Sequence, residues 1–170
     1  MQEFFTKAIV LDRADSGEAD ARVTLYTQAR GRITARAKSV RKAGSKLAAH
    51  LQPLTAIDAR IIEASGFQIV DALTTGKFQH TTALVQLMRL IKELTADDHR
   101  DDALWQRLTS TGLQGAGILK SLGLDPQHAA CHECEEKNPR YFLASNLHYV
   151  CGRCIKTTGG REYSFELSTG

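Results

Sequence analysis

Four cysteines in two pairs are the residues of this sequence best suited to chemistry. Cys131 and Cys134 form one C-x-x-C pair, and Cys151 and Cys154 form a second pair after sixteen intervening residues. Two residues between cysteines let a tight turn present both sulfurs to one ion, and two such turns complete a tetrahedron around it. Because protein fills all four ligand positions, the spacing predicts a structural Zn²⁺ site rather than a catalytic one.

The surroundings of these cysteines leave some alternatives open. An iron–sulfur cluster would accept the same four ligands, and His132 or His148 could replace one cysteine. Gly152 is expected where the backbone of the second pair folds close to the sulfurs. Four thiolates on Zn²⁺ leave a net charge of about −2. Three cations are near enough in sequence to offset it: Lys137, Arg153 and Lys156.

A second feature is a stretch without acidic residues between Asp20 and Asp58. It carries eight basic residues: Arg22, Arg30, Arg32, Arg36, Lys38, Arg41, Lys42 and Lys46. The whole chain of 170 residues has a formal net charge of only +3, so the remainder is acidic. Segregated positive charge attracts polyanions and is screened by salt, which predicts a nucleic-acid-binding surface.

Short runs of alternating polarity in the first half of the chain predict β-strands. The runs cover residues 5–11, 22–27, 32–38, 55–64 and 67–74. A polar turn is expected over residues 12–20, and a basic connector with a helical turn at Lys46–His50 over residues 39–51. Five short strands in this length favour a small closed barrel, with Phe4, Phe5 and Phe67 filling it.

Helical periodicity replaces this alternation after residue 78. Five apolar residues define the first helix: Leu84, Leu87, Met88, Ile91 and Leu94. Shorter helices are expected around Trp105 and Leu119. The fold class is therefore α+β with several domains: a five-stranded β-barrel domain at residues 1–77, and a short all-α domain at residues 78–170. The four-cysteine zinc element lies within the latter, at about residues 128–157.

The strand alternation places basic residues on one side of the expected barrel. Arg32, Arg36 and Lys38 alternate with apolar residues on the third strand. Arg22 shares a side with Tyr26, whose ring would either stack a base or cap the edge of the core. With Arg30 and the connector cations, the expected DNA-binding set is Arg22, Tyr26, Arg30, Arg32, Arg36, Lys38, Arg41, Lys42 and Lys46. Contact should be mainly with phosphates.

Several of these segments resemble the bacterial recombination mediator RecO family. They are Gly17–Asp20, Thr27, Gly31, Ala37–Lys42, Ser45 and Leu51–Pro53, together with the four-cysteine unit. The resemblance implies an oligonucleotide-binding (OB) barrel at the N-terminus, followed by a helical domain with a docked zinc element.

The same resemblance implies a function in DNA repair. It implies binding of single- and double-stranded DNA, annealing of complementary strands, and loading of RecA recombinase onto strands coated by single-strand-binding protein. The implied protein partners are RecR and the C-terminal tail of the single-strand-binding protein, with RecA reached indirectly. It implies neither a catalytic activity nor a small-molecule substrate.

Three other functions remain open at this stage. Asp97, Asp98, Asp101 and Asp102 could bind Mg²⁺ in a nuclease, although acids at a helix start also explain them. A phosphate-binding face would serve equally well in an RNA-binding or translation-associated OB/zinc-ribbon protein. A protein-interaction adaptor with incidental DNA affinity is the third. The sequence has no candidate signal peptide or membrane span, so we expect a cytoplasmic protein. The resemblance implies that it is bacterial and associated with the nucleoid.

Overall fold

The computed structural model describes residues 1–110, 115–159 and 164–167. The chain divides into two compact units. The first unit contains Met1–His80 and Ile91–Asp101, and the second contains Thr81–Leu90 and Asp102–Gly170. Among the described residues, no helix combines the length and apolar character needed to cross a bilayer.

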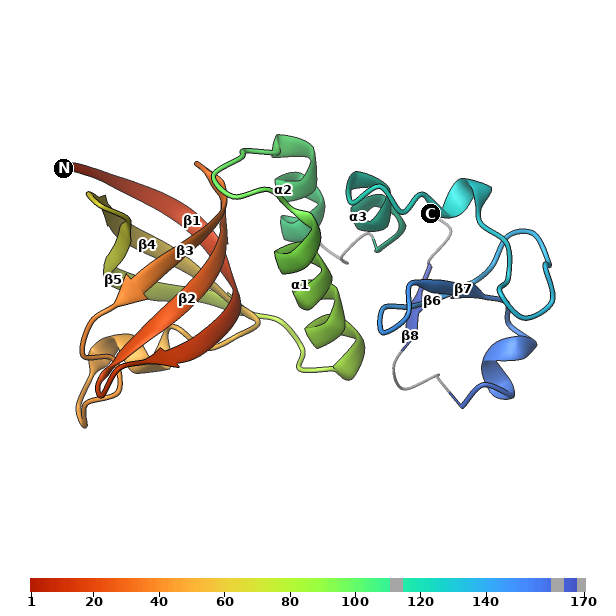
Figure 1. The fold of residues 1–170 in the computed structure, drawn as a ribbon, viewed down its shortest axis with the longest axis horizontal. Helices are drawn as coiled ribbons and strands as arrows, with labels where there is room; N and C mark the ends of the chain where they lie inside the picture. Colours follow the sequence, from red (N-terminus) through yellow and green to blue (C-terminus); the bar gives the residue numbers. More distant parts are fainter. Residues whose placement is uncertain (111–114, 160–163, 168–170) are drawn as a thin grey trace. The chain divides into compact units, whose positions relative to one another are not determined.

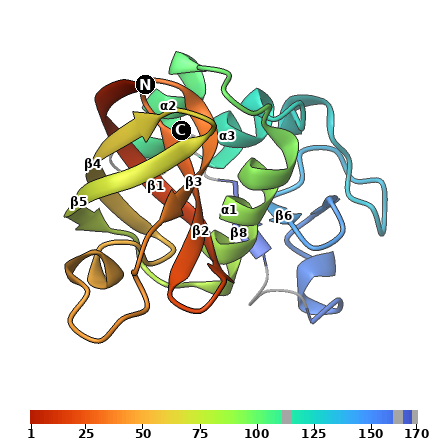
Figure 2. The ribbon, with the colours of Figure 1, turned by 60° about the vertical axis from the view of Figure 1, so that its left-hand side comes forward.

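The first unit contains a closed five-stranded barrel (Figures 1 and 2). Its strands are β1 (Gln2–Ser16), β2 (Asp20–Thr27), β3 (Gly31–Ala37), β4 (Thr55–Glu63) and β5 (Phe67–Lys77). Their order around the barrel is β1-β2-β3-β5-β4. Neighbouring strands are antiparallel except at the seam, where residues 35–37 of β3 pair in parallel with residues 67–69 of β5. This is the expected OB-type barrel, with the short 3-10 helix η1 (Lys46–Ala49) between β3 and β4.

Strand alternation determines which side chains fill the barrel. Along β3, every second residue from Gly31 to Ala37 is buried, while Thr34 and Arg36 between them are exposed. The barrel core is apolar and includes Val23, Leu25, Ile33, Ile57, Ile61 and Ile69. Phe4 and Phe67 pack against this core, but Phe5 is 75% exposed, so the prediction that it fills the barrel is wrong. Phe5 is out of step with the inward-facing residues of β1.

The first strand is also longer than predicted. The expected polar turn at residues 12–20 is wrong, because β1 continues to Ser16 and only residues 17–19 form the turn. The pairing with β2 shifts register between Val10 and Asp12 and then continues from Asp12–Thr24 to Ser16–Asp20. Backbone pairing holds this part of the strand, so its side chains can be polar and the sequence shows no apolar alternation.

The end of the first helix and the segment after it, Ile91–Asp101, belong to the barrel unit. The Asp98 N–H donates to the Arg32 carbonyl at 2.8 Å, and Lys92 forms an ion pair with Asp12 at 2.5 Å. Gly31 makes this close approach possible. Its φ is +66°, and a Cβ added there would overlap the backbone carbonyl of His99.

The second unit combines helices with a small sheet. Helix α1 (Thr82–Leu94) supplies its first part, followed by α2 (Asp102–Thr109) and α3 (Gly115–Ser121). The sheet has the order β7-β6-β8, formed by β7 (His148–Val150), β6 (Tyr141–Leu143) and β8 (Ser164–Glu166). Leu90, Leu119, Phe142 and Leu167 are buried together. The helices were expected, but these three-residue strands were not, because such short runs show no period.

Gly31→Ala should destabilise the protein strongly. We expect the free energy of unfolding in urea to fall by about 3 kcal/mol or more, because both the left-handed backbone and the approach to His99 oppose a side chain. Gly17→Ala is the matched control, since Gly17 has a φ of +64° but no atom within 4 Å of its added Cβ. It should cost only about 1 kcal/mol. Equal losses for the two variants would contradict the close approach.

Candidate metal centre and nucleic-acid interface

Two backbone turns position the four cysteines of the second unit. In the first turn, the Cys131 N–H donates to the Glu136 carbonyl at 2.9 Å and the Glu135 N–H donates to the Cys131 carbonyl at 2.8 Å. Glu135 has a φ of +58°, which brings the chain back after Cys134. An isolated bridge between Ala130 and Lys137 closes this turn.

The second turn follows β7 directly. The Ile155 N–H donates to the Cys151 carbonyl at 3.1 Å, and the Cys154 N–H donates to the Cys151 Sγ at 3.4 Å. The expectation that Gly152 is needed for close packing is wrong. Its φ is not positive, and the nearest atom to an added Cβ is the Arg140 Cδ at 3.8 Å.

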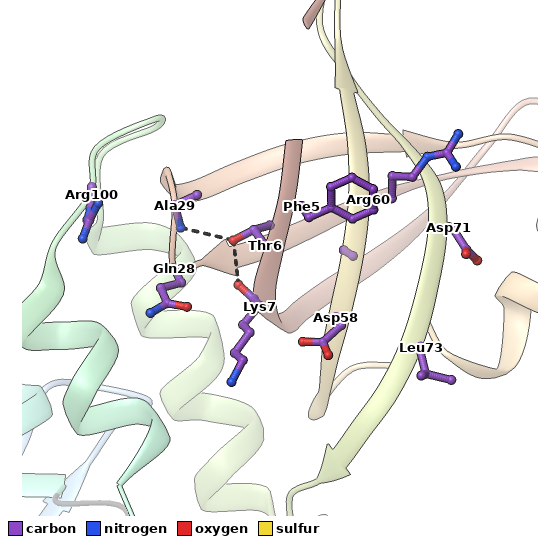
Figure 3. Close-up of a pocket in the computed structure, with 11 residues that line it drawn as sticks. Phe5, Thr6, Lys7, Gln28, Ala29, Asp58, Arg60, Asp71, Leu73 and Arg100 are labelled. Carbon is purple, nitrogen blue, oxygen red and sulfur yellow. Dashed lines mark hydrogen bonds between the residues drawn. The ribbon is translucent and has the colours of Figure 1, made fainter. Parts of the chain in front are cut away.

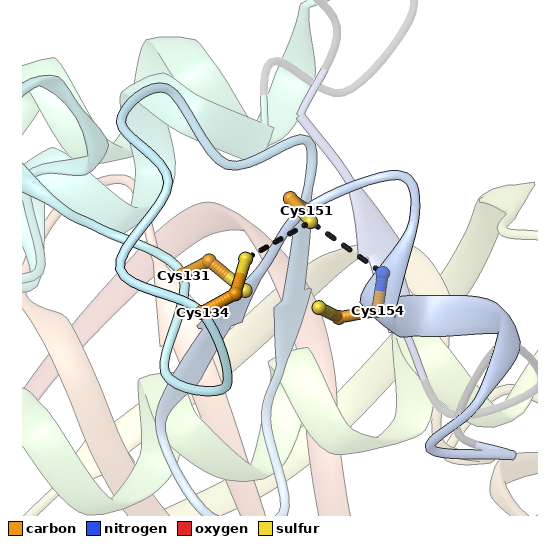
Figure 4. Close-up of side chains that lie close together, drawn as sticks. All are labelled: Cys131, Cys134, Cys151 and Cys154. Atoms are coloured by element: carbon orange, nitrogen blue, oxygen red, sulfur yellow. Dashed lines mark hydrogen bonds between the residues drawn. The ribbon is translucent and has the colours of Figure 1, made fainter.

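The sulfurs of Cys131, Cys134, Cys151 and Cys154 all lie within 4.8 Å of one another (Figure 4). The Sγ atoms of Cys134 and Cys151 are 3.8 Å apart. Zn–S bonds of about 2.3 Å place tetrahedral sulfurs about 3.8 Å apart, so this donor set fits Zn²⁺. Within the described residues, no other group of three or more potential ligands is close enough to hold an ion.

The thiols themselves require a cation if they are all to ionise. Burial raises the pKa of Cys131, but backbone N–H donors, with that of Cys151 the strongest, lower it to about 6 overall. Hydrogen bonds to the sulfurs of Cys134 and Cys151 raise the pKa of Cys154 to about 12. Near pH 7 the isolated cluster therefore retains protons that a metal ion would displace.

Neighbouring side chains pack around the cysteine cluster or form interactions beside it, but they are not among its potential ligands. Leu143, Val150 and Ile155 pack around the cysteines. Arg153 forms an ion pair with Glu136 at 2.8 Å, and its pKa is raised by Glu136 first and by the nearby sulfurs after that. The imidazoles of His132 and His148 stack on each other at 3.6 Å, outside the group of potential ligands.

The second candidate site lies at one end of the barrel. We call it the cationic end and define it by Arg22, Arg36, Lys38, Arg41, Lys42 and the following Lys46. Arg22 lies directly across from Arg36 on the paired strands β2 and β3. The Arg41 N–H donates to the Ala19 carbonyl at 2.9 Å, so the connector after β3 is fixed to the β1–β2 turn.

Acidic residues from outside the acid-free stretch meet some of these cations. Asp20 accepts hydrogen bonds from the Arg36 Nε and the Ser39 N–H, both at 2.7 Å. The Ser39 N–H, followed by Arg36, lowers the pKa of Asp20. Arg41 lies 3.5 Å from Asp15. In the part of the chain that the structure describes, Arg22, Lys38, Lys42 and Lys46 have no ion pair.

Arg30 and Arg32 lie at the opposite end of the β2–β3 hairpin. Arg30 binds Asp98 at 2.5 Å and Glu63 at 3.1 Å, and its guanidinium lies over the rings of Phe4 and Phe67. Arg32 forms an ion pair with Asp97 at 3.2 Å and donates to the Thr95 carbonyl at 2.9 Å. These two arginines hold the segment after α1, which leaves them less available to a phosphate.

Tyr26 is only 1% exposed. A base cannot stack on a ring that is covered in this way. The structure therefore supports the alternative in which Tyr26 caps the edge of the core. Of the nine residues expected to bind DNA, six are therefore at the cationic end, two are at the opposite end and one is buried.

The comparisons with known proteins agree on one family. Residues 1–77 match the family model described as recombination protein O N terminal. A DNA repair protein RecO of Nocardioides sp. is 39% identical over 87% of this chain and 72% of its own length. That of Desulfosudis oleivorans is 28% identical over all of this chain and 78% of its own length.

The chain belongs to the RecO family. A third relative, the DNA repair protein RecO of Dehalococcoides mccartyi, is 28% identical over 95% of this chain. Membership gives this RecO-family chain a role in DNA repair and recombination.

The sequence alone does not reveal the carboxylates that pair with arginines at both ends of the RecO-family barrel. Asp15 lies near the end of β1 and Asp20 begins β2, while Asp97 and Asp98 lie among the acids considered for Mg²⁺. Their pairing could have been suspected only from the unusual concentration of arginines without local partners. Asp97 and Asp98 each bind an arginine instead of forming a metal site.

Zinc should be required to hold the cysteine turns together. We expect the wild-type chain to bind about one Zn²⁺, and Cys131→Ser to weaken chelator-competed binding by on the order of 100-fold or more. Affinity should fall as pH drops through 6, because the Cys131 thiol then also gains a proton. Gly152→Ala is the control and should bind normally. Zinc retention after the Cys131 change would contradict the ligand set.

Proposed function

We propose that this chain binds DNA backbones at the cationic end of its barrel and acts as a recombination mediator. The observation that carries the proposal is the gathering of four cations without ion pairs beside two partly neutralised arginines. Exposed positive charge gains binding free energy by releasing counterions from nucleic acid, whatever its sequence. Family membership supports DNA as the polymer.

The chemistry of the cationic end favours phosphates over bases. Base recognition on single strands uses exposed aromatic rings. Tyr26 is buried, while Phe4 and Phe67 lie beneath Arg30 at the other end of the barrel. With about four phosphates neutralised on a single strand, the log–log salt slope of the binding constant should be about −3.

A sequence-independent cationic surface can promote annealing without covalent chemistry. Two strands bound near it repel each other less, which raises the probability that complementary segments pair. In this proposal the chain anneals single strands, binds duplex DNA, and helps load RecA onto strands coated by single-strand-binding protein. RecR and the tail of the single-strand-binding protein are its proposed partners, with RecA contacted indirectly. No residue is assigned a catalytic role.

Reversing the charge of basic side chains at the cationic end should abolish most DNA binding. We expect Arg22, Lys38 and Lys42, all changed to Glu, to weaken binding of a single-stranded oligonucleotide by on the order of 100-fold in dilute salt. The salt slope should become less steep by about 2. These side chains are exposed, so the free energy of unfolding should change by less than about 1 kcal/mol.

Lys77→Glu, an exposed charge reversal outside the cationic end, is the matched control and should bind DNA nearly normally. Annealing of complementary oligonucleotides across a salt series, bare and coated by single-strand-binding protein, gives the functional readout. Unchanged annealing by the triple variant would contradict the proposed surface. A clear preference for RNA over matched DNA would instead favour an RNA-binding or translation-associated function.

Removing the counter-charge of Asp20 should have the opposite effect. Asp20→Asn keeps an oxygen to accept the Ser39 N–H but releases Arg36 from its ion pair. We expect DNA affinity to rise several-fold and the salt slope to steepen by about 0.7, since one more cation becomes available. Asp58→Asn, which removes a carboxylate elsewhere on the barrel, should leave binding unchanged. Weaker binding by a folded Asp20→Asn variant would contradict this account.

A further inference from the structure

The barrel carries a groove of about 630 Å³ along β1, β4 and β5 (Figure 3). Its lining includes three cations, Lys7, Arg60 and Arg100, and two carboxylates, Asp58 and Asp71. Such a mixture selects neither a polyanion nor a polycation. The cysteine cluster of the second unit is chemically more selective, because its four sulfurs lie in different surroundings.

The four cysteines differ in their access to solvent. Cys131 and Cys151 are buried, with exposed fractions of 1% and 3%, and Cys154 is half-buried. Cys134 is exposed. An oxidant in solution modifies the most accessible thiolate of a site first. Cys134 is therefore the expected point of attack.

Arg153 adds positive charge beside two of the sulfurs. Its guanidinium donates to the Glu136 carboxylate at 2.8 Å, which holds it in place. The pKa of Arg153 is raised by Glu136 first, and the sulfurs of Cys134 and Cys151 raise it further. A partly exposed thiolate beside a cation is the usual environment of an oxidation-sensitive cysteine. Arg153 thus favours reaction at Cys134 and Cys151.

These two sulfurs also lie close together across the cluster. The Cys134 Sγ is 3.8 Å from the Cys151 Sγ, although the two residues belong to different turns (Figure 4). An S–S bond is about 2 Å long, so each sulfur would have to move by only about 1 Å. Small rotations of the two side chains supply such a movement.

We propose that hydrogen peroxide converts Cys134 and Cys151 to a reversible disulfide, with Arg153 stabilising the reacting thiolates, and that the cluster then releases its metal ion. The first unit contains no cysteine. The proposal therefore does not depend on DNA binding at the cationic end.

The reaction is a two-electron oxidation in two steps. The Cys134 thiolate attacks one peroxide oxygen, so that an S–O bond forms, the O–O bond breaks and hydroxide leaves. The Cys151 thiolate then attacks the Cys134 sulfur, so that the S–S bond forms, the S–O bond breaks and a second hydroxide leaves. Two electrons pass from the sulfurs to the peroxide, and two protons from solvent convert both hydroxides to water.

The disulfide would replace the metal ion as the link between the two turns. Cys131 and Cys154 alone are too few to hold a structural Zn²⁺. The His132 N–H donates to the Tyr149 carbonyl at 2.8 Å, which is a second link between the first turn and β7. The oxidised element should therefore stay folded without its ion. A thiol reductant would restore all four ligands.

Hydrogen peroxide added to the full zinc-loaded chain tests the proposal. A chromogenic chelator should record about one Zn²⁺ released per chain. Trypsin without reductant should then yield residues 121–137 joined to residues 141–153, with Cys154 in a separate peptide. Fragmentation of the joined peptides should place the bond on Cys134 rather than Cys131. Dithiothreitol with added zinc should restore the zinc content.

The oxidised chain should also melt at a higher temperature than the reduced chain stripped of zinc, because the disulfide constrains the unfolded state. A bond within residues 121–137, a bond to Cys154, or zinc release with no disulfide would overturn the proposal.

Arg153→Gln should slow the release of zinc by peroxide by about threefold or more, since the thiolates lose their neighbouring cation. Lys156→Gln is the matched control, because it removes an exposed cation that follows the same turn. It should release zinc at the wild-type rate. A wild-type rate for Arg153→Gln would overturn the role of Arg153.

Discussion

The arrangement of the cationic end depends on one carboxylate. Asp20 begins β2 and accepts hydrogen bonds from Arg36, near the end of β3, and from the Ser39 N–H, just beyond β3. The Arg41–Ala19 backbone hydrogen bond reinforces the same junction. Because the pKa of Asp20 is lowered, this carboxylate stays ionised at neutral and mildly acidic pH. The stability that it contributes is present above its unfolded pKa and is lost only in stronger acid.

The junction of β2 and β3 brings basic side chains together and also supplies a carboxylate that partly neutralises them. Arg22 and Arg36 are cross-strand neighbours, and two like charges in this position repel each other unless an anion is present. Asp20 supplies that anion in the free protein, and DNA phosphates would supply more of them. The cysteine cluster follows the same logic with the signs reversed, because four adjacent sulfurs can all ionise only around a cation. Each unit thus contains a cluster of groups that would carry like charge and that a group of opposite charge would stabilise.

Sequence patterns predicted the parts of this molecule that depend on local periodicity. The alternation in β2 and β3, the OB-type barrel, the helices and the four-cysteine group are all found in the structure. The paired length of β1 beyond Leu11 was missed, because a strand segment with polar side chains resembles a turn. The cysteine spacing was informative because two residues between ligands determine the local geometry almost alone.

Long-range pairing accounts for the remaining errors. The arginines of the acid-free stretch meet Asp15, Asp20, Asp97 and Asp98 only after folding. The sequence therefore does not reveal that these arginines have carboxylate partners in the free protein. Phe5 was assigned to the wrong environment and that of Tyr26 was left open, because alternation distinguishes the two sides of a strand but does not say which side another element covers. The strands β6 to β8 have three residues each, which is too short for any periodic signal.

Amide chemical-shift mapping of the zinc-loaded chain with a short oligothymidylate tests the central claim most directly. The account predicts that the largest changes occur at Arg22, Lys38 and Lys42, and that they diminish as salt is added. Arg30 and Arg32, which are held by carboxylates, should change little. Changes centred on Arg30 and Arg32 would contradict the account.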